Sequence, residues 1–376
     1  MIRFLTAGES HGPGLVTIVE GLPKGIPVGA GDFAAELARR RRGYGRGGRM
    51  MVEQDELEIL GGIRHGRTLG SPVAVVVRNT EWENWSQIMA VEGEPTGKKV
   101  TRPRPGHADL PGMLKYDTDD ARDVLERASA RETAARTIAG VLARKLLAEV
   151  GVDVLSQVVA IGDVRVDLPP PADREAIEAS EVRCPDAEAS TRMIAAIDAA
   201  IEAKDTLGGV IEVAAHGVPV GIGSHVHYDR RLDGLLAGAV MSIPGIKGVE
   251  IGSGSHVAAG PGSAAHDEIA PDRSRLTNRA GGIEGGMSNG EVILVRAHMK
   301  PLSTLMQPLQ TVDMTTGEPA QAVRERSDVC AVPAAGVVAE QMVALVLASE
   351  IQRKFGGDTI GELVDSVDRY RARIGS

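Results

Sequence analysis

Short apolar runs separated by polar turns occur along the chain and predict buried β-strands. The clearest is Ser71–Val77, which is rich in valine, and similar runs lie at 210–213 and 292–295. Runs of this length with many β-branched residues are typical of strands. A further strand is expected just before the glycine-rich segment that begins at Gly8.

Helical spacing, with apolar residues every three or four positions, occurs in two longer segments. One covers about 120–149, and its middle part, 128–135, is rich in small residues that would let a ligand or another backbone lie close. The other covers 334–355 and is predicted to be an amphipathic helix. Shorter helices are expected at 229–241 and after Asp32, a residue type that often caps a helix N-terminus.

These elements alternate, which predicts a mixed α/β fold with helices bundled inside sheets. No segment has the composition of an interdomain linker, and no repeat of 20–50 residues is present, so one domain over residues 1–376 is expected.

Composition limits the cell compartments and the classes of partner that are compatible with the chain. No apolar run approaches the roughly 20 residues that span a bilayer, and the first residues lack the apolar core of a signal peptide. The two cysteines form neither a disulfide framework nor a zinc pattern. A net charge of −9 and an aromatic content of 2% argue against nucleic acid and anionic membranes as partners. We therefore expect a cytoplasmic protein.

The first candidate site is Gly8–Gly14, a glycine-rich segment that presents His11. Histidine is readily protonated near neutral pH and suits a general acid. A tight turn with a surface histidine would give the same pattern.

The second candidate is the segment 39–49, which holds six arginines in eleven residues and several glycines. Guanidinium groups bind phosphate and carboxylate in bidentate fashion, and the glycines let the loop fold around a small anion. A solvated charged face is the structural alternative. An RNA-binding protein that uses the arginine–glycine segment is the functional alternative, which the acidic remainder of the chain disfavours.

Further polar stretches add cations, hydroxyls and carboxylates. Arg102–Asp109 is a proline-stiffened loop that presents His107, and Glu126–Thr133 places Arg127, Ser129 and Arg131 on the small-residue segment. The remaining stretches are a glycine turn at 280–290, a cation with two hydroxyls at 300–304, and a carboxylate between arginines at 324–328. Each of these alone is weak evidence.

His225, His227 and Asp229 suggest a metal site, since alternating histidines on a strand could bind a metal from one face. A metal-dependent phosphohydrolase would be the corresponding enzyme. The pattern lacks a third ligand at a recognisable spacing, so we expect no metal.

Taken in order, several segments resemble the signature series of the chorismate synthase family: Gly8–Gly12, Arg104–Asp109, Ala128–Thr133, Gly248–Gly252, Ala280–Gly282 and Lys300–Pro301. The resemblance extends from about residue 3 to about residue 350. It implies a single α/β (α+β) domain whose helical core lies between antiparallel β-sheets. It also implies a carbon–oxygen lyase acting on phosphate, which eliminates phosphate from 5-enolpyruvylshikimate 3-phosphate in a 1,4-anti sense to give chorismate.

The resemblance also implies roles for individual residues. His11 would protonate the leaving phosphate, His107 would donate a proton toward the reduced flavin, and Asp328 would help to remove the ring proton. The residues expected to bind flavin are Arg127, Ala128, Ser129, Pro244, Gly245, Gly285, Lys300, Pro301, Leu302, Ser303, Thr304 and Arg326. Those expected to bind substrate or NADP are Arg40, Arg46, Arg49 and Arg131.

The partners that the resemblance implies are reduced FMN and a small-molecule substrate in aromatic amino acid biosynthesis. NADPH is a candidate reductant, and a separate reductase is the alternative. A homotetramer is expected because family members usually form one.

The chain departs from the family pattern at two places. It has Ser327 and Val329 where the family has His and Pro on either side of the catalytic aspartate. Pro244 and Gly245 stand where a side chain such as Asn or Gln is typical, so any flavin contact there would come from backbone.

Overall fold

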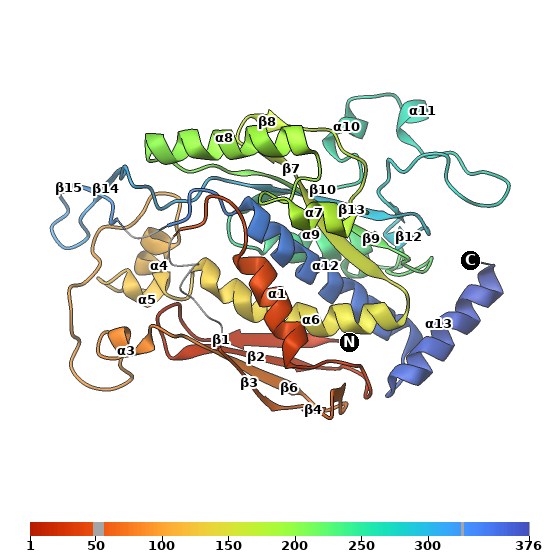
Figure 1. Ribbon diagram of the computed structural model, residues 1–376, viewed down its shortest axis with the longest axis horizontal. Helices are drawn as coiled ribbons and strands as arrows, with labels where there is room; N and C mark the ends of the chain where they lie inside the picture. The colour runs from red at the N-terminus through yellow and green to blue at the C-terminus, as the bar shows by residue number, and fades with distance from the viewer. Residues whose placement is uncertain (48–55, 325–326, 376) are drawn as a thin grey trace.

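Two antiparallel sheets enclose a layer of helices in the computed structural model, which describes residues 1–47, 56–324 and 327–375. In Figure 1, α1 (Ala30–Arg41), α6 (Thr133–Glu149) and α12 (Val332–Phe355) lie between the red and orange strands below and the green and cyan strands above. This arrangement confirms the predicted α/β fold with a helical core between antiparallel sheets.

The first sheet comes from the N-terminal part of the chain and has the strand order β1-β2-β6-β3. Its inner face packs on α6, where the buried Thr17 hydroxyl donates a 3.0 Å hydrogen bond to the carbonyl of Ala135. The run at 71–77 is confirmed as a strand, and so is the strand expected before Gly8. The bounds are β1 (Arg3–Ala7), β2 (Gly14–Glu20), β6 (Val73–Arg78) and β3 (Glu56–Gly61), with the small hairpin β4 (Ile63–Arg64) and β5 (Arg67–Thr68) beside them.

The second sheet has the order β10-β13-β9-β7-β8. The apolar runs at 210–213 and 292–295 are confirmed as parts of its central strands, which pair in antiparallel register with Val213 opposite Val295. The bounds are β10 (Ile246–Ile251), β13 (Ile293–Met299), β9 (Gly209–His216), β7 (Asp153–Ile161) and β8 (Val164–Arg165).

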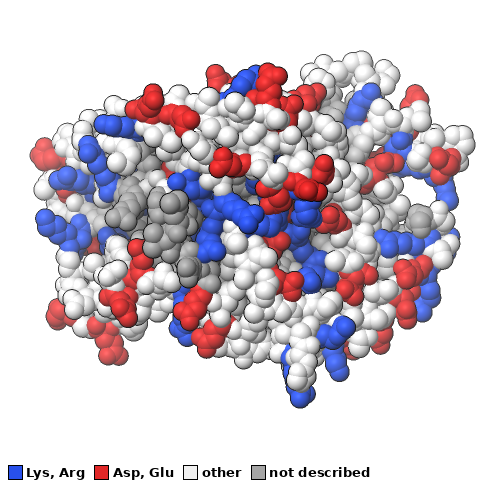
Figure 2. Space-filling view, in the orientation of Figure 1, with Lys and Arg blue, Asp and Glu red and all other residues white. Residues whose placement is uncertain are grey.

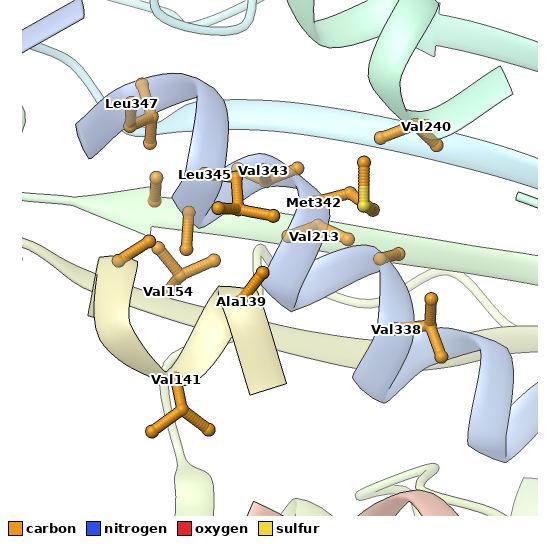
Figure 3. Close-up of a cluster of buried hydrophobic side chains, with 14 of the residues drawn as sticks. Ala139, Val141, Val154, Val213, Val240, Val338, Met342, Val343, Leu345 and Leu347 are labelled. Carbon is orange, nitrogen blue, oxygen red and sulfur yellow. The ribbon is translucent and has the colours of Figure 1, made fainter. Parts of the chain in front are cut away.

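Helix α12 lies in the centre of the hydrophobic core. Figure 3 shows its side chains among Val213 of β9, Val240 and Ala139. The helix is buried on nearly all sides, so the prediction of an amphipathic helix is wrong. Among the described residues α12 alone is long and apolar enough to cross a membrane, contrary to the sequence-based expectation, but 89% of its apolar window is buried inside the protein.

The helix predicted over 120–149 is broken, because Ser129 has an extended backbone and its hydroxyl accepts a hydrogen bond from the N–H of Arg131. Such local side-chain bonds compete with helical ones. The segment divides into α5 (Arg122–Leu125), the 3₁₀ helix η1 (Ala130–Glu132) and α6. Small residues in α6 do allow a close approach, since a Cβ on Gly140 would lie 2.2 Å from the Cβ of Gln341 in α12.

Helix α1 begins three residues earlier than predicted. Gly29 is its N-cap, and the Asp32 carboxylate accepts a 2.8 Å hydrogen bond from the backbone N–H of Gly29. Asp32 therefore satisfies a donor at the helix start from the third helical position.

The remaining elements surround this core. The helix expected at 229–241 is divided into η2 and α9. The last helix, α13, was not predicted, although Thr359 and Glu362 form a capping box at its start. The helices are α3 (Trp82–Trp85), α4 (Asp109–Tyr116), α7 (Arg174–Ala179), α8 (Ala187–Ala203), η2 (Tyr228–Arg230), α9 (Leu232–Met241), α10 (Ser255–Ala258), α11 (Gly262–Ala265) and α13 (Ile360–Ile374). The short strands are β11 (Ile283–Glu284), β12 (Met287–Ser288), β14 (Gln310–Val312) and β15 (Pro319–Gln321).

Candidate active site

His11 lies in the turn between β1 and β2 and is held by a buried carboxylate. Its Nδ1 is 2.9 Å from Oε2 of Glu126, which also accepts a 3.0 Å hydrogen bond from the backbone N–H of His11. The imidazole stacks on Trp85 with a centroid separation of 4.0 Å. The turn requires glycine at position 8, where φ is +103° and a Cβ would lie 2.2 Å from the carbonyl oxygen of Gly14.

A small cavity next to His11 is lined by polar groups, among them Ser10, Asn79 and Arg131. The Asn79 amide donates to three carbonyls of the His11 turn, at 2.7 to 3.2 Å, and its oxygen accepts from the Arg131 guanidinium at 3.1 Å. Arg131 is thus fixed beside His11, and both residues line this cavity.

His107 forms a second histidine–carboxylate pair. Its Nδ1 contacts the fully buried Asp109, which also accepts a 2.8 Å hydrogen bond from Nε of Arg104. Burial by itself would raise the pKa of Asp109, but the hydrogen bonds from His107 and Arg104 outweigh it and hold the pKa well below its ordinary value. Asp109 therefore stays ionised and orients the imidazole.

The loop 300–304 lies against the His107 loop. Nη1 of Arg104 is 3.0 Å from the Thr304 hydroxyl, and the Ser303 hydroxyl donates to the carbonyl of Gly106 at 2.8 Å. Lys300 donates to Ser303 at 2.7 Å, and burial together with Lys247 lowers the pKa of this ammonium group. Residues about 200 positions apart thus share one site.

An open pocket of about 510 Å³ lies at the start of α6. Three of its lining residues, Arg127, Ala128 and Pro244, were expected to bind flavin. Gly245 joins this pocket to the His107 region, because its carbonyl accepts a 2.9 Å hydrogen bond from the N–H of Lys300. The other lining residues are Phe4, Thr6, Glu132, Arg136, Ser242 and Met342.

The arginine segment enters the site from α1. Figure 2 shows lysine and arginine atoms gathered in the centre of one face, over α1. Arg40 is only 4% exposed and donates to the Thr133 hydroxyl at 2.8 Å, so it ties α1 to the start of α6. Arg46 lies 3.3 Å from the Asp328 carboxylate. The predicted residues Arg49 and Arg326 lie outside the described residues.

Asp328 is joined to the loop 300–304 through the strand-like segment before β9. The N–H of Leu207 donates to the carbonyl of Val329 at 2.9 Å, and the Thr206 hydroxyl donates to the carbonyl of Leu302 at 2.8 Å. Leu302 and its neighbour Pro301 therefore lie close to the Asp328 segment.

Gly285 is placed apart from the other predicted residues. It lies in the turn between β11 and β12, where Gly286 accepts a hydrogen bond from Leu232 at the start of α9. Pro244 follows the other end of this ten-residue helix, and a helix of that length spans about 15 Å.

Several contributing residues were not predicted. Glu126 opens the stretch Glu126–Thr133 but was given no role there, Asn79 has no motif that marks it, and Trp85 belongs to a one-turn helix without a buried residue. Arg39 was treated as part of an anion-binding run, yet it forms ion pairs with Glu36, Glu178 and the fully buried Glu340. Because Arg40 is buried and Arg39 is held in these ion pairs, the two arginines are unsuited to an exposed RNA-binding face.

The candidate metal residues are not on a strand. His225 and His227 lie in bends before η2, and Nδ1 of the exposed His227 bonds Asp229 at 2.8 Å. In the part of the chain that the structure describes, no group of three His, Cys, Asp or Glu residues could hold a metal ion.

The chain is similar to known proteins over almost its whole length. The profile of the family described as Chorismate synthase matches residues 2–351. A protein named Chorismate synthase from Parafrankia sp. (strain EAN1pec) is 57% identical over 387 residues, covering 98% of each chain. One of the same name from Salinispora tropica is 58% identical over 377 residues, covering 96% of each.

A solved structure supports the same relationship. It is described as Crystal Structure of Chorismate Synthase, has a TM-score of 0.80 and 40% sequence identity, and covers 99% of this chain and 98% of that chain. These similarities give no support to the RNA-binding alternative.

Proposed function

The chain belongs to the chorismate synthase family and is a lyase of the shikimate pathway, and we propose that it works with reduced FMN held in the pocket lined by Arg127, Ala128 and Pro244. Its substrate, 5-enolpyruvylshikimate 3-phosphate, loses phosphate to give chorismate. The observation that carries the proposal is the series of hydrogen bonds that joins the Asp328 segment, the loop 300–304 and the His107 loop next to this pocket.

The pocket fits a flavin in size and chemistry. Its volume of about 510 Å³ lies within the usual range for small-ligand sites. Apolar side chains such as Met342 suit a planar ring, and Lys300, reached through Gly245, supplies a cation for an anionic group. The further proposed contacts are Ser129, Gly285, Pro301, Leu302, Ser303, Thr304 and Arg326.

Bound reduced flavin would supply an electron-rich ring that eases the loss of phosphate and of the ring proton. His11 protonates the leaving phosphate, and Arg131 offsets the charge that develops on it. Asp328, oriented by Gly47 and Arg46, accepts the ring proton. His107, oriented by Asp109, donates a hydrogen bond toward the cofactor.

The remaining proposals concern the whole protein. One domain over residues 1–376 is supported by a main hydrophobic core that draws on residues from Ile2 to Val367. We expect a cytoplasmic homotetramer of this 39.5 kDa chain, which sedimentation would measure. Arg40, Arg46 and Arg49 are the proposed contacts for phosphorylated ligands. NADPH oxidation with FMN and no added reductase would distinguish intrinsic flavin reduction from reliance on a separate reductase.

The test is an anaerobic assay that follows chorismate by its ultraviolet absorbance with chemically reduced FMN. We expect turnover with reduced FMN, none with oxidised FMN, and a large loss in His11→Ala but not in the exposed control His266→Ala. Turnover that is equal with and without reduced flavin, or a fully active His11→Ala, would contradict the proposal.

A further inference from the structure

His11 is enclosed by two residues to which the family resemblance assigned no role. The Glu126 side chain is 1% exposed, and its carboxylate takes both the Nδ1 and the backbone N–H of His11. Trp85 covers the imidazole face at an interplanar angle of 28°. Arg122 completes the group, since it donates to Glu126 at 2.8 Å and lies 5.1 Å from the centre of the Trp85 ring.

We infer that Glu126 and Trp85 are positioning residues that hold His11 in one ring orientation, in which Nδ1 keeps its proton on the carboxylate and Nε2 is the atom that donates its proton to phosphate. The inference rests on the proposed role of His11 as the acid. A carboxylate accepts but does not donate, so Nδ1 must carry a proton when it bonds Glu126. The proton that His11 gives up then leaves from Nε2.

The stack with Trp85 adds a second restraint. Turning the imidazole out of its plane about the Cβ–Cγ bond would break the stack, and a half-turn about that bond would take Nδ1 away from Glu126. Since α3, which carries Trp85, has no buried residue, its contacts with His11 and Arg122 are among those that locate it.

The charges around His11 come from three neighbouring segments. Glu126 and Arg122 face it from α5 and its end, and Glu9 belongs to its own turn. Glu81 and Arg131 line the small cavity with it, from the segment before α3 and from η1. Removing the Glu126 charge therefore alters one member of a set whose other members remain.

Histidine labelled with ¹⁵N shows the tautomer directly, and His11→Asn assigns the His11 signal. We expect the neutral imidazole of the parent chain to carry its proton on Nδ1, since Glu126 holds that proton and Nε2 is the atom that gains and loses one. In Glu126→Gln the amide can donate to Nδ1, so the Nε2-protonated form should increase. Glu126→Asp should restore part of the parent signal, and the exposed control Asp119→Asn should leave it unchanged.

Kinetics then separate this inference from the proposed function. Glu126→Gln should lower kcat by about 10- to 100-fold, with KM changed less than about threefold, because binding groups remain in place. An unchanged tautomer, or full activity of Glu126→Gln while His11→Ala is inactive, would overturn the positioning role alone. Full activity of His11→Ala would overturn the role of His11 itself, and the inference with it.

Trp85 provides an independent measurement that does not depend on the folding of a Glu126 variant. The chain has two tryptophans, so Trp82→Phe leaves Trp85 as the single indole. The imidazole stacked on the indole should quench its emission, and adding His11→Asn should raise the emission. Emission that does not respond to His11→Asn would show that the stack is absent in solution and would overturn the role of Trp85.

Discussion

The backbone N–H of Gly47 donates a 2.7 Å hydrogen bond to the carboxylate of Asp328, 281 residues further along the chain. Arg46 approaches the other carboxylate oxygen at 3.3 Å. A Cβ on Gly47 would lie 3.0 Å from the carbonyl oxygen of Ser327, so the close approach favours glycine. The end of the arginine segment therefore orients the proposed base.

The first prediction concerns Asp328. Asp328→Asn keeps the acceptor oxygen for Gly47 but removes the basic carboxylate. We expect kcat to fall by about 10²- to 10⁴-fold, the usual range for a lost general base, with FMN binding retained. The anaerobic chorismate assay and an FMN titration measure the two effects. Asp163→Asn, in the exposed turn between β7 and β8, is the control. Retention of activity in Asp328→Asn would exclude this carboxylate as the base.

The second prediction is that Asp109 acts through His107. Asp109→Asn and His107→Ala should each lower kcat, and the double variant should lose little more than His107→Ala alone. Such non-additivity is expected when two residues form one unit. Additive losses would show that Asp109 contributes separately, for example by supporting Arg104, and thermal unfolding of each variant would reveal that structural contribution.

Local patterns in the sequence predicted much of the fold. The valine-rich run that became β6 and the apolar spacing in α6 needed only neighbouring residues to be read correctly. The break at Ser129 was missed because one hydroxyl bond decides it, against a helical pattern on both sides. The all-round burial of α12 depends on which elements surround it, and that is a property of the tertiary structure.

In the candidate site, too, local motifs were predictable from the sequence and contacts between distant residues were not. Glycine and arginine motifs identified the turn of His11 and the loop of His107, and the structure links these to neighbouring motifs. The role of Glu126 could not be found in this way although it opens the stretch Glu126–Thr133, since its partner His11 lies 115 residues away. Arg39 was counted within the anion-binding segment 39–49, and its pairing with the buried Glu340 could not be foreseen because that residue is 301 positions away.

The third prediction tests the flavin pocket. Ala128→Leu adds three carbons to the pocket lining, which should weaken FMN binding at least about tenfold, since overfilled sites must move neighbouring groups. Quenching of flavin fluorescence on binding gives the affinity. Ala203→Leu, at the exposed end of α8, provides the same change of residue outside the pocket. Equal affinities in the two variants would place the flavin elsewhere.

Buried charge beneath the arginine segment leads to the last prediction. Glu340 of α12 is fully buried and pairs with Arg39 of α1 at 2.8 Å and Arg183 at 2.7 Å. Burial would raise the pKa of Glu340, but Arg39, Arg183 and Arg144 outweigh it and lower the pKa to about 2, from 4.5. The unfolded chain therefore binds the proton more readily than the folded one.

It follows that Glu340 stabilises the fold above pH 4.5 and that this contribution is lost as the pH falls toward about 2. Glu340→Gln removes the buried carboxylate from three arginines, Arg39, Arg144 and Arg183, and should lower the free energy of unfolding by about 3–5 kcal/mol at pH 7. Urea unfolding at pH 7, 4 and 3 should also show a weaker loss of stability with acid than in the parent chain. Glu58→Gln breaks the half-exposed pair with Arg78 and should cost about 0–1 kcal/mol with the pH dependence unchanged. If both variants lost the same stability, the buried network would contribute no more than a surface ion pair.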